Sequence, residues 1–373
     1  MPGKKKMRTR RARLNPTHAN TPVSLKDLAD SLGLSSTTVS LVLNHSPIAN
    51  SIPARTKRRI FSLAKKLHYH PNFVARSLRA KRSYTIGVMV PEVSEGYEAM
   101  VLSGIEDFLL QEGYFYFVVS HRHRHDLIEE YPHLLLARSI EGLIAVDTPC
   151  GRNLPIPVVA VSGHREVERV TNIVLDHDEA AALAVGHLFD LGHRKIALIK
   201  GQSFSSDTEV RWASLRRAMS ARGLPLETLL TAQLEGDTPS PQLGYLATKK
   251  ILAAGLPFTG LIAFNDVSAI GAIRALREAG FRVPEDVSVV GFDDIQSAAF
   301  QNPALTTIRQ PLWQMGQLAA ETVLRRIAKG ASAPYPRTLM VEPKLVVRES
   351  TAQAPPELSV ASERPSAALA GND

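Results

Sequence analysis

Apolar residues between positions 22 and 44 recur at helical spacing, and this pattern predicts two short helices around a tight turn. The first helix has one apolar stripe, formed by Leu25, Leu28, Ala29 and Leu32. Ser24 and Asp27 have the spacing of a capping box, so they mark the start of this helix. Gly33 is suited to the left-handed conformation that ends it.

The second helix is expected to begin after Ser35 and to present an uncharged outer face. Val39, Val42 and Leu43 are assigned to its inner side. The opposite face is small and polar except for one leucine, and it comprises Thr37, Ser40, Leu41 and Asn44. Such a face can enter the major groove of DNA without repelling phosphates. We interpret the pair as a helix-turn-helix, with an ordinary helical hairpin as the alternative.

A third helix is expected from about Ala54 to Leu67. Its inner stripe is apolar and consists of Ile60, Leu63, Ala64 and Leu67. Its outer face is basic and consists of Arg55, Lys57, Arg58, Arg59, Lys65 and Lys66. A charged helix face is usually only solvated, but no acid balances this one. The pattern therefore favours contact with the DNA backbone.

The segment from Phe73 to Ala80 follows the helix breaker Pro71 and predicts a helix of only two turns. A helix this short is unstable alone in water, so it needs a partner helix or a groove. Leu78 lies between Arg76 and Arg79. An apolar wedge flanked by cations suits a minor groove that is being opened. A basic linker is the alternative interpretation.

From Tyr84 onward, short apolar runs alternate with amphipathic stretches. The runs cover 84–90, 114–119, 142–146, 158–161, 173–175, 196–199, 261–264 and 287–290. The stretches of helical length cover 97–111, 178–191, 208–222, 241–254 and 266–279. This alternation predicts parallel sheets covered by helices. About 265 residues suit two such sheets better than one.

The charge is divided unevenly along the 373 residues. The whole chain has 44 Lys and Arg against 36 Asp and Glu, a net charge of +8. Residues 1–82 contain 18 basic and two acidic residues, a net +16, so the remainder carries −8. A basic head on an acidic body indicates one nucleic-acid-binding end. The acidic body should avoid DNA.

Several protein classes are disfavoured by what the sequence lacks. No apolar run is long enough for a membrane span, and the basic N-terminus has no apolar segment of a secretory signal behind it. The single cysteine, Cys150, fits a reducing cytoplasm and is expected to be idle. No triad, phosphate loop or CxxC motif predicts an enzyme or a cofactor. His121, His123 and His125 alternate with arginines that would oppose a metal, so a solvated loop is expected there.

The order of these motifs resembles the lactose-repressor (LacI/GalR) family of bacterial transcription regulators. The resemblance covers roughly residues 22 to 350. It rests on L-K-D-L-A with T-T-V-S-L-V-L-N, H-P-N-F-V-A-R-S-L-R, L-G-H-R-K-I-A-L-I-K-G, V-P-E-D-V-S-V-V-G-F-D-D, L-T-T-I-R-Q-P and L-V-V-R-E-S. It implies an N-terminal all-α helix-turn-helix head. It also implies an α/β periplasmic-binding-protein-like body of two doubly wound parallel-sheet subdomains, joined by three crossovers. A ligand would bind in the cleft at the strands' carboxyl ends.

The resemblance assigns DNA-reading positions. Ser36 and Thr37 would read bases at the start of the second helix. Leu41 stands where the family often has an arginine, so it can offer only apolar contact, for instance to a thymine methyl. The wedge of the family's hinge helix falls on Leu78, with Ala75 and Arg79 beside it. Paired hinge helices would kink the central base step.

The resemblance also assigns an effector site. Tyr97 would stack on the ligand, with Glu95 as an unusual acid at the same edge. Arg211 matches the cleft arginine, and Asp293 matches the ligand-contacting carboxylate. Phe264 and Asn265 stand at the end of another strand. This chemistry is sugar-like or polyol-like. The absence of an acid at the strand end of Val161 and Ser162 weakens the sugar interpretation, and strand-end carboxylates also cap helices.

We expect the following organisation: a disordered basic tail over 1–20, a helix-turn-helix domain over 21–70 and a hinge over 71–83. A two-lobed effector-binding and dimerisation domain over 84–350 and a disordered tail over 351–373 complete it. The tail has no leucine heptad, so a homodimer is expected. The predicted function is a ligand-controlled DNA-binding regulator, and in particular a repressor that binds an operator. The alternative is a solute-binding protein or a sugar-processing enzyme on the same body.

Overall fold

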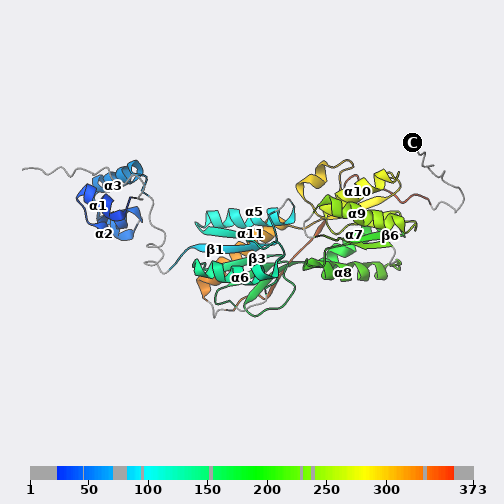
Figure 1. The fold of residues 1–373 in the computed structure, drawn as a ribbon, viewed down its shortest axis with the longest axis horizontal. Helices are drawn as coiled ribbons and strands as arrows, with labels where there is room; N and C mark the ends of the chain where they lie inside the picture. Colours follow the sequence, from blue (N-terminus) through cyan, green and yellow to red (C-terminus); the bar gives the residue numbers. More distant parts are fainter. Residues whose placement is uncertain are drawn as a thin grey trace, which may run out of the picture. The chain divides into compact units, whose positions relative to one another are not determined.

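The computed structural model describes residues 23–44, 46–69, 82–93, 96–150, 154–226, 230–236, 240–330 and 334–356. The chain divides into two compact units, residues 1–83 and 84–373 (Figure 1). Several sequence predictions lie outside the described residues. They concern the tail over 1–20, the hinge residues Ala75, Leu78 and Arg79, and Glu95.

The first unit contains the predicted helices packed around a small core. The helices are α1 (Leu25–Leu32), α2 (Ser36–Leu43), the 3-10 turn η1 (Pro47–Ser51) and α3 (Ala54–Lys66). The buried side chains that hold them together are Leu28, Ala29, Val39, Val42, Ala49, Ile60 and Ala64. The predicted capping box is present, since the Ser24 hydroxyl accepts from the Asp27 amide at 3.2 Å. Gly33 ends α1 with a φ of 66°.

The second unit begins with a six-stranded sheet in the order β11-β5-β4-β3-β1-β2. Its strands are parallel, and they are β1 (Thr85–Val90), β2 (Phe115–Ser120), β3 (Gly142–Val146), β4 (Val158–Val161), β5 (Val170–Leu175) and β11 (Thr338–Val341). Helices α5 (Tyr97–Gln111) and α11 (Leu312–Lys329) cover one face. Helix α6 (His125–Ala137) packs on the other face through Leu135.

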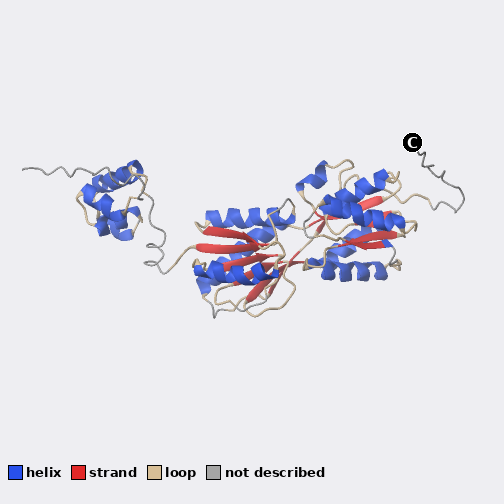
Figure 2. Ribbon diagram, viewed as in Figure 1, coloured by secondary structure: helices blue, strands red, loops and turns tan. Residues whose placement is uncertain are grey.

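A second six-stranded sheet has the order β12-β10-β9-β8-β6-β7. Its strands are β6 (Ile196–Lys200), β7 (Thr231–Gln233), β8 (Gly260–Ile262), β9 (Ser288–Asp293), β10 (Thr306–Arg309) and the antiparallel β12 (Lys344–Val346). Helices α7 (His177–Asp190) and α8 (Asp207–Ala221) pack on one face, and α9 (Pro241–Ala253) and α10 (Asp266–Glu278) on the other. A 3-10 turn, η3 (Gln296–Phe300), follows β9. Figure 2 shows both sheets between their helices.

The chain crosses between the two subdomains three times, as the resemblance implied. The crossovers follow β5, β10 and β11, because the next element in each case belongs to the other subdomain. Each connection is at most two residues long: residue 176, residues 310–311 and residues 342–343. Three connections of one or two residues therefore form the covalent link between the two subdomains, or lobes, of the body.

The structure corrects two local predictions. The histidine-rich segment is solvated only in part: Arg122, Arg124 and His125 are exposed, but His121 is buried and its Nε2 lies 3.0 Å from the Thr148 hydroxyl. Burial also lowers the pKa of His121 to about 4. Residues 351–356, which we expected to belong to a disordered tail, hydrogen-bond to the body instead. The amide of Ala354 donates to the carbonyl of Leu191 at 2.8 Å.

Two glycines allow α5 and α11 to approach each other closely. A Cβ atom at Gly104 would lie 2.0 Å from the carbonyl oxygen of Trp313. A Cβ atom at Gly316 would lie 2.0 Å from the carbonyl oxygen of Val101. In both cases the atom that would clash belongs to the backbone, which cannot change its rotamer as a side chain can. The helix spacing on this face of the first sheet therefore depends on both glycines.

We predict that Gly104→Ala destabilises the body by about 2 kcal/mol, because the added methyl group forces the two helices apart. Urea unfolding followed by circular dichroism measures the change. Ser103→Ala, at the exposed neighbouring position of α5, is the control and should leave the midpoint within error. Equal midpoints for the Gly104 variant and the control would contradict the close packing.

Candidate DNA-reading surface and effector pocket

The start of α2 presents exposed polar side chains at Ser36 and Thr37. The Ser35 hydroxyl caps this helix by accepting from the Thr38 amide at 3.1 Å. Because α2 is capped at this end, both exposed side chains are held at the first turn of a fixed helix. The geometry therefore matches what a recognition helix needs, since its N-terminal residues contact base edges.

The assignment of Ser40 to the outer face was wrong. Ser40 is only 5% exposed, and its hydroxyl accepts from Asn44 Nδ2 at 3.1 Å. The same Asn44 nitrogen donates to the Ser40 carbonyl at 2.8 Å. Leu41 is half-buried against the core of the first unit. An eight-residue helix packed against α1, α3 and η1 leaves little of its surface to solvent, which is why the outer face is narrower than expected.

Most of the basic side chains of this helix unit lie on α3. Within residues 23–69 there are seven Lys and Arg against Asp27 and Asp30. Five of the cations lie exposed on α3, and they are Arg55, Arg58, Arg59, Lys65 and Lys66. This surplus supplies the sequence-independent attraction to phosphates that nucleic-acid binding requires.

A pocket lies between the two subdomains of the body, and both subdomains contribute residues to its lining. The first subdomain contributes Tyr97, Glu98, His123 and Asp147, and the second contributes Gln202, Phe204, Ser205, Asp207, Arg211, Phe264, Asn265 and Asp293. The structure thus brings together five of the six predicted effector residues. The seven additional residues were not predicted. Asp147 and Gln202 follow β3 and β6, so the strand-end rule that identified Asn265 could have found them.

Arg211 lies deep in this pocket and is 3% exposed. Its guanidinium donates to Asp207 Oδ2 at 3.1 Å and to the carbonyl of Phe264 at 2.5 Å. The guanidinium carbon lies 4.5 Å from the ring centre of Phe264 and 4.6 Å from that of Phe292. The charge is therefore held in a fixed position between two aromatic rings.

Asp293 ends β9 with a φ of 110° and is 4% exposed. Its Oδ1 accepts from Gln310 Nε2 at 2.6 Å. Burial raises the pKa of Asp293 to about 7, although the Arg211 charge and the Gln310 hydrogen bond act in the opposite direction. This carboxyl group therefore titrates near neutral pH, where it can donate or accept a proton in a hydrogen bond to a ligand.

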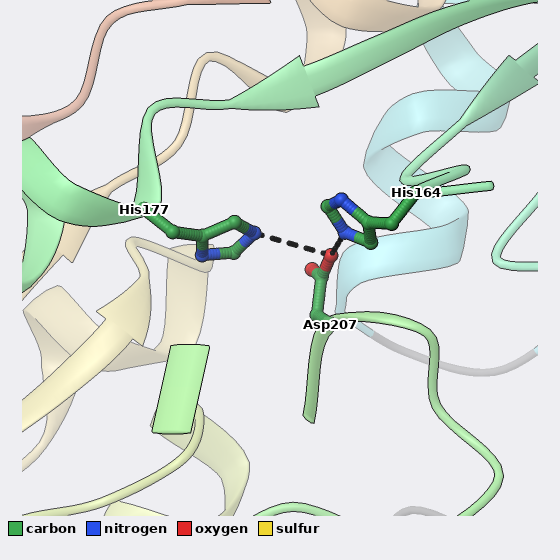
Figure 3. Close-up of side chains that lie close together, drawn as sticks. All are labelled: His164, His177 and Asp207. Carbon is green, nitrogen blue, oxygen red and sulfur yellow. Dashed lines mark hydrogen bonds and ion pairs between the residues drawn. The ribbon is translucent and has the colours of Figure 1, made fainter. Parts of the chain in front are cut away.

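Asp207 is the hub of a polar network (Figure 3). Its Oδ1 accepts from His164 Nε2 at 2.6 Å and lies 3.3 Å from His177 Nε2. Its Oδ2 accepts from Arg211, and from the Ser162 hydroxyl at 3.4 Å. Burial acts to raise the pKa of Asp207. The opposing effect of His177, His164 and Arg211 is larger and holds that pKa well below its usual range.

Two histidines and a carboxylate are also ligands that zinc accepts, and their donor atoms lie within 4.8 Å of one another. However, the second oxygen of Asp207 is already paired with the Arg211 guanidinium. His177 and Asp207 also begin α7 and α8, and helix N-termini carry a partial positive charge. We therefore interpret the cluster as the buried Asp207 carboxylate with its hydrogen-bond donors, and not as a metal site.

The remaining acids of the pocket are Glu98 and Asp147. Burial raises the pKa of Glu98 to about 8, and the charges of Asp147, Glu92 and Asp293 add to the shift. Burial and the Asp207 charge likewise raise the pKa of Asp147. Asp147 Oδ1 accepts from the Ser206 amide at 3.0 Å and from its hydroxyl at 2.6 Å. Acids of the second subdomain therefore raise the pKa values of Glu98 and Asp147 in the first.

Comparison with known proteins assigns the family. Residues 24–72 match the family model for bacterial regulatory proteins of the lacI family, and residues 185–351 match the periplasmic binding protein-like domain. The HTH-type transcriptional repressor PurR of Haemophilus influenzae is 31% identical over 337 residues, which is 88% of this chain and 98% of the relative. PurR of Yersinia pestis is 32% identical over 342 residues, 89% and 98% of the two chains. The chain belongs to the LacI family.

Solved structures of LacI-family proteins have the same fold. The Lac repressor dimer bound to operator and the anti-inducer ONPF matches with a TM-score of 0.78 and 28% identity, over 89% of this chain and 100% of that chain. The regulator CelR in complex with cellobiose matches with a TM-score of 0.66 and 27% identity, over 88% and 99%. The family and fold predictions are thus confirmed: this LacI-family chain is a transcriptional repressor with a ligand-binding domain. None of the helices in the described part of the chain is long and apolar enough to span a membrane.

We predict that Glu98→Gln flattens the pH dependence of the body's stability. The pKa of Glu98 is about 8 in the folded protein and about 4.3 in an unfolded chain. The folded protein therefore retains a proton that the unfolded chain has released. The free energy of unfolding therefore falls as the pH rises from the unfolded pKa to the folded pKa of Glu98, and this fall ends above about pH 8.

Urea midpoints measured between about pH 7 and pH 9 test this. This window lies above the ordinary pKa of histidine, so those side chains contribute little. The variant should show a smaller decline than the wild type up to about pH 8. Glu112→Gln, at the exposed C-terminal end of the same helix, is the matched control and should follow the wild type. Parallel curves for the Glu98 variant and the wild type would contradict the shift.

Proposed function

We propose that the protein binds a near-palindromic operator as a homodimer and that a small polar molecule in the pocket controls this binding. The observation that carries the proposal is the position of the pocket. Its polar side chains come from both subdomains, which are linked covalently only by three short crossovers. A molecule held by both walls has different contacts when the lobes move. It therefore shifts the balance between two arrangements of the body.

The DNA-binding half of the proposal rests on the helix-turn-helix. Ser36 and Thr37 would contact base edges in the major groove, while the cations of α3 contact phosphates. The exposed parts of Leu41 and Asn44 would border the same groove. Two copies related by a two-fold axis would place their recognition helices in successive major grooves, and this explains why the operator should be nearly palindromic.

The ligand-binding half rests on Arg211, Asp293 and their neighbours. Arg211 is fixed between two rings, and Asp293 titrates near pH 7. Tyr97, Phe264 and Asn265 complete the predicted set, and Glu95 stays a candidate outside the described residues. The related regulator CelR was solved with cellobiose. A polar metabolite with hydroxyl groups is therefore the class that we propose, and such a protein needs no cofactor.

Selection of binding sites from random DNA by the full-length protein tests this function directly. We expect a near-palindromic consensus whose affinity changes when a panel of metabolites is added. Thr37→Ala should alter the preferred base at one position in each half-site. It should also weaken binding to the wild-type consensus about tenfold, because a base contact contributes about 1–3 kcal/mol.

Ser31→Ala, on the exposed end of α1, is the control for this selection and should return the wild-type consensus. A wild-type protein that enriches no sequence would contradict the proposed function. A Thr37 variant that selects the same consensus with the same affinity would contradict its base-reading role.

The hinge wedge yields a separate prediction. Leu78→Ala should weaken binding to the selected operator much more than binding to random DNA, because only a specific complex opens the minor groove. Fluorescence titrations of both DNAs at the same salt concentration measure the two losses. Equal losses would rule out a wedge at this position, while Arg76→Ala should weaken both complexes and reduce the salt dependence.

A further inference from the structure

The pocket contains more acid than its ligand-binding arginine can balance. Its lining has four carboxylates, those of Glu98, Asp147, Asp207 and Asp293, and Arg211 is the one Lys or Arg among the lining residues that the structure describes. With histidines counted as neutral, the formal charge of the lining is −3.

The nitrogen donors of this site converge on one acid, Asp207. Arg211, His164 and His177 all contact Asp207. No Lys, Arg or His of the described residues forms an ion pair with Glu98, Asp147 or Asp293. The Asp147 carboxylate accepts hydrogen bonds from the neutral Ser206. The Asp293 carboxylate accepts one from the neutral Gln310. Three buried or half-buried carboxyl groups therefore face the cavity, and of these only Asp293 is stabilised by a nearby positive charge among the described residues, that of Arg211.

These three carboxyl groups come from different elements that converge on the cavity. Glu98 lies in the first turn of α5, and Asp147 follows β3 in the same subdomain. Asp293 ends β9 in the other subdomain. Glu98 interacts electrostatically with both of the others. A positive charge placed among them would therefore contact both lobes.

Aromatic rings line the same cavity. Tyr97 and Phe204 belong to the lining, and the Phe204 ring lies 3.7 Å from that of His123. Aromatic faces attract ammonium groups, and acids beside them add direct ion pairing. A neutral polyol would not compensate charged carboxylates, so beside it these groups would have to stay protonated to avoid the cost of buried, unpaired charges.

We infer that the effector carries a positively charged nitrogen, held by Glu98 and Asp147 from one subdomain and by Asp293 from the other. This inference rests on the proposed function and names the chemical class of the ligand. Hydroxyl groups on the same molecule would still suit Arg211 and Asn265. The effector would thus be an amine-bearing polar compound, not a neutral sugar. A bare divalent metal ion on Asp207 is a different source of positive charge, and the test separates the two.

Isothermal titration of the full-length protein with three probes of equal length tests the inference. The probes are butane-1,4-diol, the corresponding amino alcohol and the diamine putrescine, which share a four-carbon chain and carry none, one and two ammonium groups. EDTA is present throughout, so that trace metal contributes nothing. We expect the amino alcohol to bind about tenfold more tightly than the diol, with proton release from the carboxyl groups at pH 7. Glu98→Gln should remove most of this difference.

Glu112→Gln removes the same charge from the other end of α5 and should keep the preference for the amine. Asp147→Asn provides a second pocket variant should Glu98→Gln fold poorly, as judged by its melting temperature. A separate titration with zinc chloride, without EDTA, is compared between the wild type and His177→Ala. Zinc binding that is lost in this variant, without any preference for the amine, would overturn the inference in favour of a metal site.

The inference is also overturned if the diol binds as tightly as the amines, if no amine binds, or if both glutamate variants lose the preference equally. Failure here is distinguishable from failure of the proposed function. A protein that selects a DNA consensus but responds only to neutral sugars retains the proposed function and loses the cationic effector. A protein that prefers the amine but selects no DNA sequence retains the cationic ligand and loses the proposed function.

Discussion

The two lobes of the body depend on one buried carboxylate, that of Asp207. From the first subdomain it accepts hydrogen bonds from His164 and Ser162, and from the second it contacts His177 and Arg211. Its neighbour Ser206 also reaches across, to Asp147. An isolated charge in this position would be costly, so each donor that is removed leaves the buried anion less well compensated. The shape of the pocket and the fixed position of Arg211 both follow from this network.

The same network explains why a ligand could control the arrangement of the lobes. The covalent links between them are short, and most of the polar contacts across the pocket end on Asp207 or beside it. A ligand that binds in this pocket competes with those contacts or adds to them, and it does so on both walls at once. Only the difference in its affinity for two arrangements can shift their populations. In the proposed function, that difference is transmitted to the spacing of two DNA-binding heads.

Much of the fold is predictable from the sequence because buried strands and amphipathic helices leave strong patterns. The predicted helix over 97–111 and strand over 158–161 agree with α5 and β4 to the residue. Strands β7 and β12 have three residues each, too few positions to show a pattern, and they were not predicted. Local periodicity also failed at Ser40, because α2 is packed from more than one side and tertiary contacts decide which face is buried.

Part of the pocket lining was also predictable from the sequence, because the positions of the strands indicate which residues follow them. Residues after parallel strands gather at one edge, so Asn265 and Asp293 could be placed from strand positions alone. Asp207 begins a helix and resembles an ordinary helix-terminal acid, a position at which carboxylates are common for reasons unrelated to ligands. Its partners His164 and His177 lie 43 and 30 residues away in the sequence. No local spacing could have associated the three residues, since only the packing of the two lobes brings them together.

The division of charge along the chain connects the two proposals. The chain from residue 83 onward carries a formal −8, and the pocket lining within it carries −3 by the same count. An acidic body repels DNA phosphates, so only the basic head can dock on a duplex. The same field attracts small cations and raises their concentration near the cleft. If the effector carries a positive charge, one uneven distribution of acidic and basic residues therefore directs each of the two ligands to its own end of the molecule.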